Sequence, residues 1–263
     1  MPHAIFERDG DHVVPTAIAR GPWDPDACHG GAPAALLAAM IDGVPAPVPM
    51  QGVRLTYEIL RPVPLAPLRT DLRVLREGRR VQVVEADLDT ADGTPLIRCR
   101  ALRIRTGDVD LPESAATDDP APRVDPNTLS RFTGNEAWEP YGFWDAVDVR
   151  FVEGELGPAG PATCWFRLAA PLIDGLEPTP LARVAAAADF GNGIGSPLPF
   201  GPYVFVNPDL SFSMHRLPAG DWVALTSYSV ANTSGIGLAT SKLYDRTGRI
   251  GIATQSLYVD RLA

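Results

Sequence analysis

Segments in which hydrophobic and polar residues alternate make up most of this 263-residue chain. Alternation with a period of two predicts strands with one buried face, because successive side chains of a strand point to opposite sides of the sheet. In the first half such segments cover residues 51–64, 68–78, 79–93 and 94–105, after a shorter one at 12–19. In the second half they cover residues 148–156, 162–170, 203–220, 221–230, 237–248 and 249–259.

One alanine-rich stretch in each half departs from this alternation. ACHGGAPAALLAAMID (27–42) and PLARVAAAADFGNGIG (180–195) consist mostly of small and apolar residues, and each predicts a helix. A sheet must bury one face, and a single helix lying across it does so. We therefore predict an α+β protein of the double hotdog type, in which two antiparallel sheets each wrap around a central helix. A generic α+β protein with two similar hairpin regions is the alternative.

Two landmarks indicate that the two halves are copies of one unit. Arg61 and Arg216 lie 155 positions apart, and so do the turn glycines Gly93 and Gly248. Between the halves, GDVDLPESAATDDPAPRVDP (107–126) has prolines and acidic residues but no apolar period, which is typical of a surface linker. We expect an N-terminal hotdog at residues 1–106, a linker at 107–135 and a C-terminal hotdog at 136–263.

Charge and composition exclude several classes of protein. A net charge of −9 without a basic tract argues against nucleic-acid binding. No run approaches the roughly 20 apolar residues of a membrane span, and the N-terminus MPHAIFERDGDHVV lacks the features of a signal peptide, so a cytoplasmic protein is expected. The cysteines Cys28, Cys99 and Cys164 follow no metal-ligand spacing, and no glycine-rich dinucleotide fingerprint follows a strand. We expect neither a metal nor a cofactor.

Several motifs resemble those of the acyl-CoA thioesterase II family and its thioesterase-like relatives. HGGAPAALLAAM and YEILRPVPLAPLRTDLRVLREGRRV are similar to that family's first half. PDLSFSMHR and GLATSKLYDRTGRIGIATQSLYV are similar to a strand and to the final hairpin of its second half. The likeness covers roughly residues 22–105 and 180–260 in the family's order. It implies a double hotdog that hydrolyses fatty acyl-CoA to free acid and coenzyme A, with acyl-CoA as the partner and a homo-oligomer as the assembly.

The resemblance also implies a catalytic set in the second half. In the family a water is held by an aspartate, a threonine or serine, and a glutamine. Motif for motif, the aspartate falls on Asp209 and the glutamine on Gln255, while Ser229 and Thr233 both qualify as the hydroxyl residue. At the offset of 155, Asp209 and Gln255 have the unlike counterparts Arg54 and Arg100, as expected of a site built once between two copies.

The start of the first helix supplies the other candidates. His29, Gly30 and Gly31 stand where backbone N–H groups of a helix have no internal partner, and such groups polarise a ligand carbonyl. The acyl chain is then expected between helix and sheet, beside small residues such as Ala35 and Ala39. Asp189, at the end of the second helix, either orients the site or forms local hydrogen bonds, and the local role is slightly favoured.

Two other functions fit the sequence. A non-catalytic acyl or acyl-CoA-binding protein would keep the fold without the chemistry. A hotdog hydratase or dehydratase would need an acid paired with a histidine, and the second helix has Asp189 but no histidine.

Overall fold

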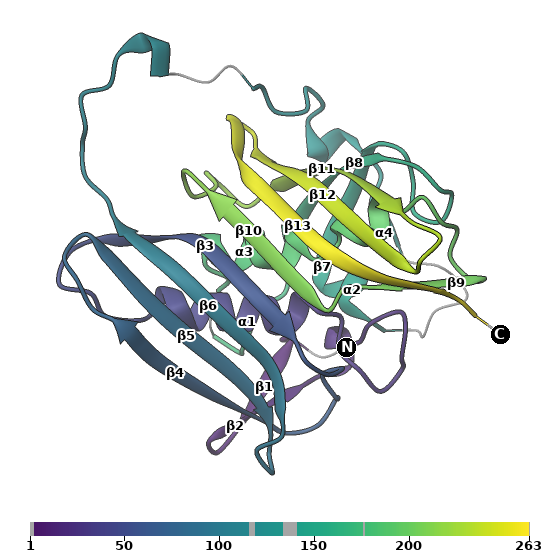
Figure 1. Cartoon of the computed structure of the whole chain (residues 1–263), viewed down its shortest axis with the longest axis horizontal. Coiled ribbons are helices and arrows are strands. Elements are labelled where there is room, and N and C mark those ends of the chain that lie inside the picture. The colour runs from purple at the N-terminus through teal and green to yellow at the C-terminus, as the bar shows by residue number, and fades with distance from the viewer. Residues whose placement is uncertain (1–2, 116–118, 134–140, 176, 263) are drawn as a thin grey trace.

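The computed structural model describes residues 3–115, 119–133, 141–175 and 177–262. It consists of two units of helix and antiparallel sheet that lie side by side (Figure 1). The expected start of the C-terminal unit at residue 136, and the linker residues 116–118 and 134–135, lie outside the described residues. Among the described residues, no helix is both long and apolar enough to cross a membrane.

The described residues of the first half form one α-helix, a short 3-10 helix at Ala17–Ala19 and six strands. The strands are β1 (Phe6–Asp9), β2 (His12–Pro15), β3 (Met50–Ile59), β4 (Leu68–Arg76), β5 (Val81–Thr90) and β6 (Pro95–Arg105), and the helix is α1 (Gly31–Asp42). Strands β1 and β2 form a hairpin whose turn includes Gly10, at a φ of 58°.

The second half adds a break in its helix and one further strand. Its strands are β7 (Val147–Glu153), β8 (Ala162–Leu168), β9 (Tyr203–Val206), β10 (Asp209–Met214), β11 (Val223–Ala231), β12 (Ile236–Asp245) and β13 (Gly248–Arg261). Its helices are α2 (Phe143–Ala146), α3 (Pro180–Ala188) and α4 (Gly191–Ile194).

The strands of the two halves repeat with the offset that the sequence predicts. Adding 155 to the bounds of β4 gives 223–231, the bounds of β11, and adding it to the bounds of β5 gives 236–245, the bounds of β12. The strand order β1-β2-β4-β5-β6-β3-β10-β13-β12-β11-β8-β7 reads as one half followed by its mirror order, with β3 and β10 paired at the centre. The predicted double hotdog is confirmed.

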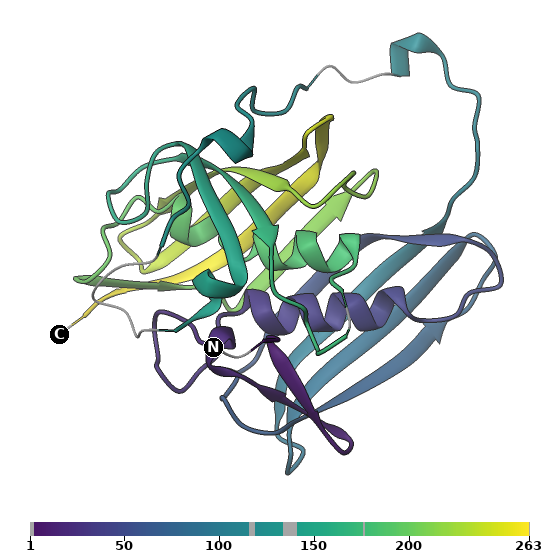
Figure 2. The same ribbon diagram turned by 180° about the vertical axis from the view of Figure 1, so that it is seen from behind.

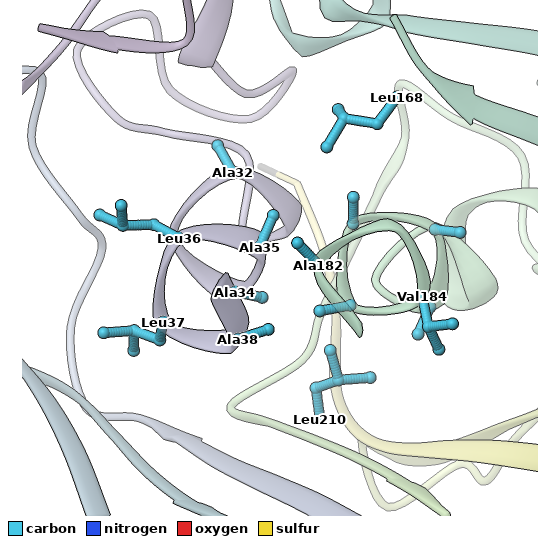
Figure 3. Close-up of a cluster of buried hydrophobic side chains, with 14 of the residues drawn as sticks. Ala32, Ala34, Ala35, Leu36, Leu37, Ala38, Leu168, Ala182, Val184 and Leu210 are labelled. Carbon is cyan, nitrogen blue, oxygen red and sulfur yellow. The ribbon is translucent and has the colours of Figure 1, made fainter. Parts of the chain in front are cut away.

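Helix α1 is buried on nearly all sides, which explains why its sequence shows no polar face. It lies beside α3 within the curve of the sheets (Figure 2), and small side chains allow the two helices to approach closely. Figure 3 shows Ala34, Ala35 and Ala38 of α1 near Ala182 of α3. The Tyr57 hydroxyl on β3 donates to the Ala34 carbonyl at 3.0 Å and so ties the helix to the sheet.

Two breaks in the second half direct polar side chains inward. Helix α3 begins with Thr179, whose hydroxyl accepts from the Ala182 N–H, and with Pro180 in the first turn. It ends at Asp189, and the chain continues into α4 only after Phe190. The segment expected as one strand at 203–220 is interrupted at Asn207 and Pro208, because a proline has no N–H for a ladder bond.

Part of the linker follows the outer face of the second sheet. The Asp119 carboxylate accepts from Tyr244 and from Arg249, and Ala121 and Leu129 pack against the cluster around Trp165 and Trp222. The linker is therefore anchored to the second half at these positions.

Candidate functional site

A cavity of about 370 Å³ opens between the two halves of the chain. The first half contributes the start of α1, including His29 and Gly30, and the segment that follows β3. The second half contributes Asp189, Asn192 and Asn207. The cavity therefore joins the predicted helix start to three polar residues of the other copy.

Asp189 is the buried carboxylate of this cavity, with 5% of its surface exposed. Its Oδ1 accepts from Asn207 Nδ2 at 3.0 Å, and its Oδ2 lies 3.0 Å from His29 Nδ1. A Cβ atom at Gly30 would lie 2.8 Å from Oδ2, so only glycine fits against the carboxylate here. The end of the α3 helix thus delivers a carboxylate to the start of α1.

The His29 ring is held between two aromatic rings. Its centroid lies 5.0 Å from that of Phe143 and 4.5 Å from that of Phe190. The Gly31 N–H donates to His29 Nδ1 at 3.0 Å, on the same nitrogen that faces Asp189. A proton on Nδ1 favours the contact with Asp189, whereas a bare Nδ1 favours the hydrogen bond from Gly31. The protonation of one ring nitrogen therefore decides whether the Gly31 N–H is engaged or free.

Three amides connect Asp189 to the last strand. The Asn192 side chain donates to Asn207 Oδ1 at 3.3 Å and to the Phe205 carbonyl at 3.2 Å. The buried Gln255 accepts from the Asn192 backbone N–H at 3.0 Å and donates to the Asp189 carbonyl at 3.4 Å. These bonds fix the turn between α3 and α4, and with it the position of the Asp189 side chain.

A glycine allows this turn to lie close to the sheet. A Cβ at Gly191 would lie 2.5 Å from Ser241 Oγ and 3.0 Å from Gln255 Oε1. Ser241 and Ser227 form a buried hydroxyl pair at 2.6 Å beneath it. The predicted Gln255 therefore belongs to the structure that supports the site.

Asp209 and Gln255 do not come together. Ser211 pairs with Thr254 in the β10–β13 ladder, so continuing the register places Asp209 opposite Ser256. The Ser256 N–H donates to Asp209 Oδ1 at 2.6 Å on the exposed side of the sheet. Since neighbouring residues of a strand point to opposite faces, the side chain of Gln255 points inward and that of Asp209 outward. The expectation that they share one water does not fit this register.

The two hydroxyl candidates lie outside the wall of this cavity. Ser229 is buried in β11, where its N–H donates to the Gly195 carbonyl at the end of α4, and its hydroxyl has no partner among the described residues. Thr233 is exposed in the turn between β11 and β12. Neither lines the cavity between the halves.

Sequence reasoning gave Asp189 a local role and did not consider Asn192 or Asn207. The features of the sequence that could have pointed to these residues are two interruptions of regular structure. One is the end of α3 at Asp189, and the other is the break between β9 and β10 at Asn207 and Pro208. Of the helix-start residues, His29 and Gly30 line the cavity, and the Gly31 N–H donates to the His29 ring.

Cys28 lies in the same wall, but its thiol is not activated. Burial raises the pKa of Cys28 well above its ordinary value, so the thiol stays protonated at neutral pH and is a poor nucleophile. Among the described residues, no cluster of histidine, cysteine, aspartate or glutamate could hold a metal ion.

A second, apolar chamber of about 50 Å³ adjoins the first cavity. The two share Pro22, Trp23, His29 and Asn192 as wall residues. The rest of the chamber is formed by Phe132 of the linker and by the second half, which contributes further aromatic rings, among them Phe151, Phe190 and Phe200. A ligand bound at Asp189 would therefore have an apolar space on one side and the larger cavity on the other.

A carboxylate, a helix start and two adjoining cavities define a site suited to an acyl compound at the interface of two hotdog units. The chain belongs to the acyl-CoA thioesterase family: that family's C-terminal domain matches residues 114–259 and its N-terminal domain residues 19–104. No sequence matches it among functionally curated proteins.

Solved structures show the same fold over nearly the whole chain. A conserved protein of unknown function with the hot dog fold from Alicyclobacillus acidocaldarius is 17% identical, with a TM-score of 0.72 over 98% of this chain and 96% of that one. The acyl-CoA thioesterase II TesB2 of Mycobacterium marinum is 17% identical, with a TM-score of 0.63 over 90% and 91% of the two chains. The tesB protein of Mycobacterium avium subs paratuberculosis is 19% identical, with a TM-score of 0.59 over 97% and 96%.

Proposed function

We propose that the protein hydrolyses acyl-CoA thioesters to a carboxylic acid and coenzyme A, with Asp189 as the general base. The observation that carries this proposal is the buried Asp189 carboxylate, held by Asn207 and facing His29 in a cavity between the two halves. Family membership supports the thioester as substrate. The proposal replaces Asp209 by Asp189 as the base, because the strand register turns Asp209 away.

Asp189 accepts a proton from a water molecule as that water attacks the thioester carbonyl. A general base must lie within hydrogen-bond reach of the proton that it takes, and a lined cavity gives a water this access. Asn207 occupies Oδ1, so Oδ2 is the oxygen that receives the proton. His29, 3.0 Å from Oδ2, orients this oxygen.

The start of α1 stabilises the negative charge that develops on the carbonyl oxygen. N–H groups in the first turn of a helix point toward the ligand, and the helix dipole favours an anion there. The Gly31 N–H becomes available to the oxyanion when the His29 Nδ1 carries a proton and turns to Asp189. Each well-placed donor contributes about 3 kcal/mol to such a transition state.

The intermediate then collapses with cleavage of the carbon–sulfur bond. The thiolate of coenzyme A leaves with the electron pair, and the proton held by Asp189 neutralises it directly or through solvent. The exposed Arg61, in the wall of the larger cavity, offers a positive charge for the phosphates of coenzyme A.

Release of free thiol from acyl-CoA esters tests the proposal. Asp189→Asn should lower kcat about 10²- to 10⁴-fold, the usual contribution of a general base. Asp209→Asn is the matched control and should retain activity within a few-fold, with both variants folded by circular dichroism. A loss in Asp209→Asn alone would return the base to Asp209, and equal losses in the two variants would contradict the assignment of the base to Asp189.

Gln255 provides a second check on the assignment. Gln255→Leu removes the acceptor for the Asn192 N–H and the donor to the Asp189 carbonyl, so Asp189 should lose its position and kcat should fall about tenfold or more. Ser256→Ala, the neighbouring residue on the outer face, should leave kcat unchanged. Unaltered turnover in Gln255→Leu would contradict its role in positioning Asp189.

Two other outcomes lead to different functions. Acyl-CoA that raises the melting temperature without releasing thiol would indicate an acyl-CoA-binding protein. The His29–Asp189 pair at 3.0 Å favours a second candidate, hydration of an enoyl thioester, because that chemistry pairs an acid with a histidine. Loss of enoyl-thioester absorbance without thiol release would support hydration over hydrolysis.

A further inference from the structure

We propose that the apolar chamber beside His29 receives the acyl group and limits the preferred substrates to short acyl chains of about four to six carbon atoms. This inference rests on the proposed function and adds the substrate class to it. Its basis is the size, position and lining of the chamber, together with the close packing of the two central helices.

The chamber lies where the acyl group of a thioester bound at Asp189 must go. It shares His29 and Asn192 with the larger cavity, and these residues contact Asp189 and the turn beside it. If the thioester carbonyl lies at this junction, its acyl group and its sulfur substituent can each enter one of the two cavities. The larger, more polar cavity of about 370 Å³ suits the amide-containing arm of coenzyme A, and the apolar chamber suits hydrocarbon.

The volume of the chamber limits the chain. A water-sized group needs about 10–15 Å³ of such space, so the chamber of about 50 Å³ holds roughly three to five such groups beyond the carbonyl carbon. A decanoyl chain exceeds this space about two- to threefold and a palmitoyl chain about three- to fivefold. Binding a longer chain would require the wall to move.

Packed aromatic rings form the wall of the chamber at two places. Phe151 of β7 contacts Phe132 edge to face, with their centroids 6.0 Å apart. Trp23, from the first half, stacks on Phe200 at 5.3 Å and meets Phe205 edge-on at 5.0 Å. A long chain would have to displace one of these packed pairs.

The slot expected beside Ala35 and Ala39 of α1 is filled, so an acyl chain does not run along these two residues. Ala35 is fully buried and Ala39 is 9% exposed. Figure 3 shows the side chains of Ala34, Ala35 and Ala38 packed toward α3. This correction to the sequence-based expectation is independent of the size of the chamber and leaves the chamber as the apolar space next to His29.

Thiol release from acetyl-, butyryl-, hexanoyl-, decanoyl- and palmitoyl-CoA tests the proposal. We expect kcat/KM to be highest for butyryl- or hexanoyl-CoA and at least tenfold lower for decanoyl-CoA, since a single methylene that does not fit costs about tenfold or more. A wild type that prefers decanoyl- or palmitoyl-CoA would overturn the chain-length limit and leave hydrolysis intact.

Substitutions in the wall test whether the chamber itself sets the chain-length preference. Phe151→Leu and Phe151→Ala should enlarge it and move the optimum toward longer chains, whereas Leu156→Trp should fill it and move the optimum toward acetyl-CoA. Phe212→Leu, in the core on β10, is the control for loss of a buried ring and should leave the order of substrates unchanged. The same order in all four variants would contradict the proposal.

If the protein released no thiol from any ester, the proposed function would be refuted. Binding of acyl-CoA would then test whether the chamber holds the acyl group. In calorimetric titrations, tighter binding of hexanoyl-CoA than of decanoyl-CoA, reversed by Phe151→Ala, would retain the chamber as the acyl site. Equal or tighter binding of decanoyl-CoA to the wild type would overturn it.

Discussion

His29 and Asp189 come from different halves of the chain and meet with Nδ1 of the imidazole 3.0 Å from Oδ2 of the carboxylate. Neither half alone contains this pair. Each half contributes a helix end, the start of α1 and the end of α3, and the packing of the two helices brings these ends together. The duplication therefore supplies a scaffold, and divergence between the copies supplies the site.

At Gly30 the contact between the start of α1 and Asp189 leaves little space for a side chain. Gly30→Ala would place a Cβ 2.8 Å from Asp189 Oδ2, so the carboxylate must shift or the helix start must move. We expect kcat for thioester hydrolysis to fall at least 10²-fold, because misplacement by about 1 Å costs this much. The free energy of unfolding should decrease by about 1–3 kcal/mol, as is usual for overpacking.

Gly107→Ala is the matched control for this substitution. A Cβ at Gly107 meets no atom of the described residues within 4 Å, so both activity and stability should stay at the wild-type level. Steady-state kinetics and urea unfolding of the two variants make the comparison. Wild-type kcat in Gly30→Ala would show that the contact between α1 and Asp189 is unimportant for catalysis.

Cys28 should contribute nothing to the chemistry although it lines the larger cavity. Burial raises the pKa of its thiol, so at pH 7 to 8 the reactive thiolate is scarce. We expect Cys28→Ala to keep kcat within about twofold, and iodoacetamide at pH 8 to leave the wild type active. Rapid inactivation that acyl-CoA prevents, and that Cys28→Ala abolishes, would mean that the thiol is ionised and close to the substrate.

The fold was largely predictable, because it depends on patterns that repeat. Alternation located the strands, and the offset of 155 fixed by Arg61 and Gly93 reproduces the bounds of β4 and β5 in β11 and β12. The polar centre was not predictable in the same way. Asp209 matches the family's aspartate motif, but the face of the sheet on which its side chain lies depends on the pairing of β10 with β13, which the sequence does not show. Asp189 reaches the site because α3 ends there, and no periodic signal marks this.

Asp245 should make the stability of the protein depend on pH. The side chain is fully buried, and burial alone would raise its pKa, but hydrogen bonds from Arg216 and from the N–H groups of Ala219 and Thr247 hold the pKa well below its usual range. One of the Arg216 bonds, from Nη2 to Oδ1, measures 2.8 Å. A carboxylate with a lowered pKa stabilises the folded state above the unfolded-state pKa near 4 and loses this effect as pH falls.

We therefore expect Asp245→Asn to lower the free energy of unfolding by about 3 kcal/mol at pH 7, because it leaves Arg216 without its charge partner. The difference in free energy of unfolding between wild type and variant should become smaller as pH falls below about 4. Urea unfolding at pH 7 and pH 3 measures it. Asp221→Asn, which removes an exposed ion pair with Arg183, should cost less than about 1 kcal/mol. A gap that is constant with pH would contradict the argument.

The outer face of the second sheet carries the surface on which we expect a second copy to pack. Val230 and Leu238 are neighbours across β11 and β12, and Ile236 and Tyr258 are neighbours across β12 and β13. All four are exposed, Ile236 by about two-thirds and the others by about half. A contiguous apolar patch of this kind on a sheet face is typical of a protein interface. The homo-oligomer implied by the resemblance would bury it.

The double substitution Val230→Glu and Leu238→Glu should therefore weaken self-association, because each carboxylate would have to be buried without a partner. We expect the dissociation constant to rise at least 100-fold, which corresponds to about 2.7 kcal/mol. Sedimentation velocity over a range of concentrations measures it, with Val109→Glu in the exposed linker as the control. A wild type that is monomeric at every concentration, or a double variant that associates as the wild type does, would show that this face is not the interface.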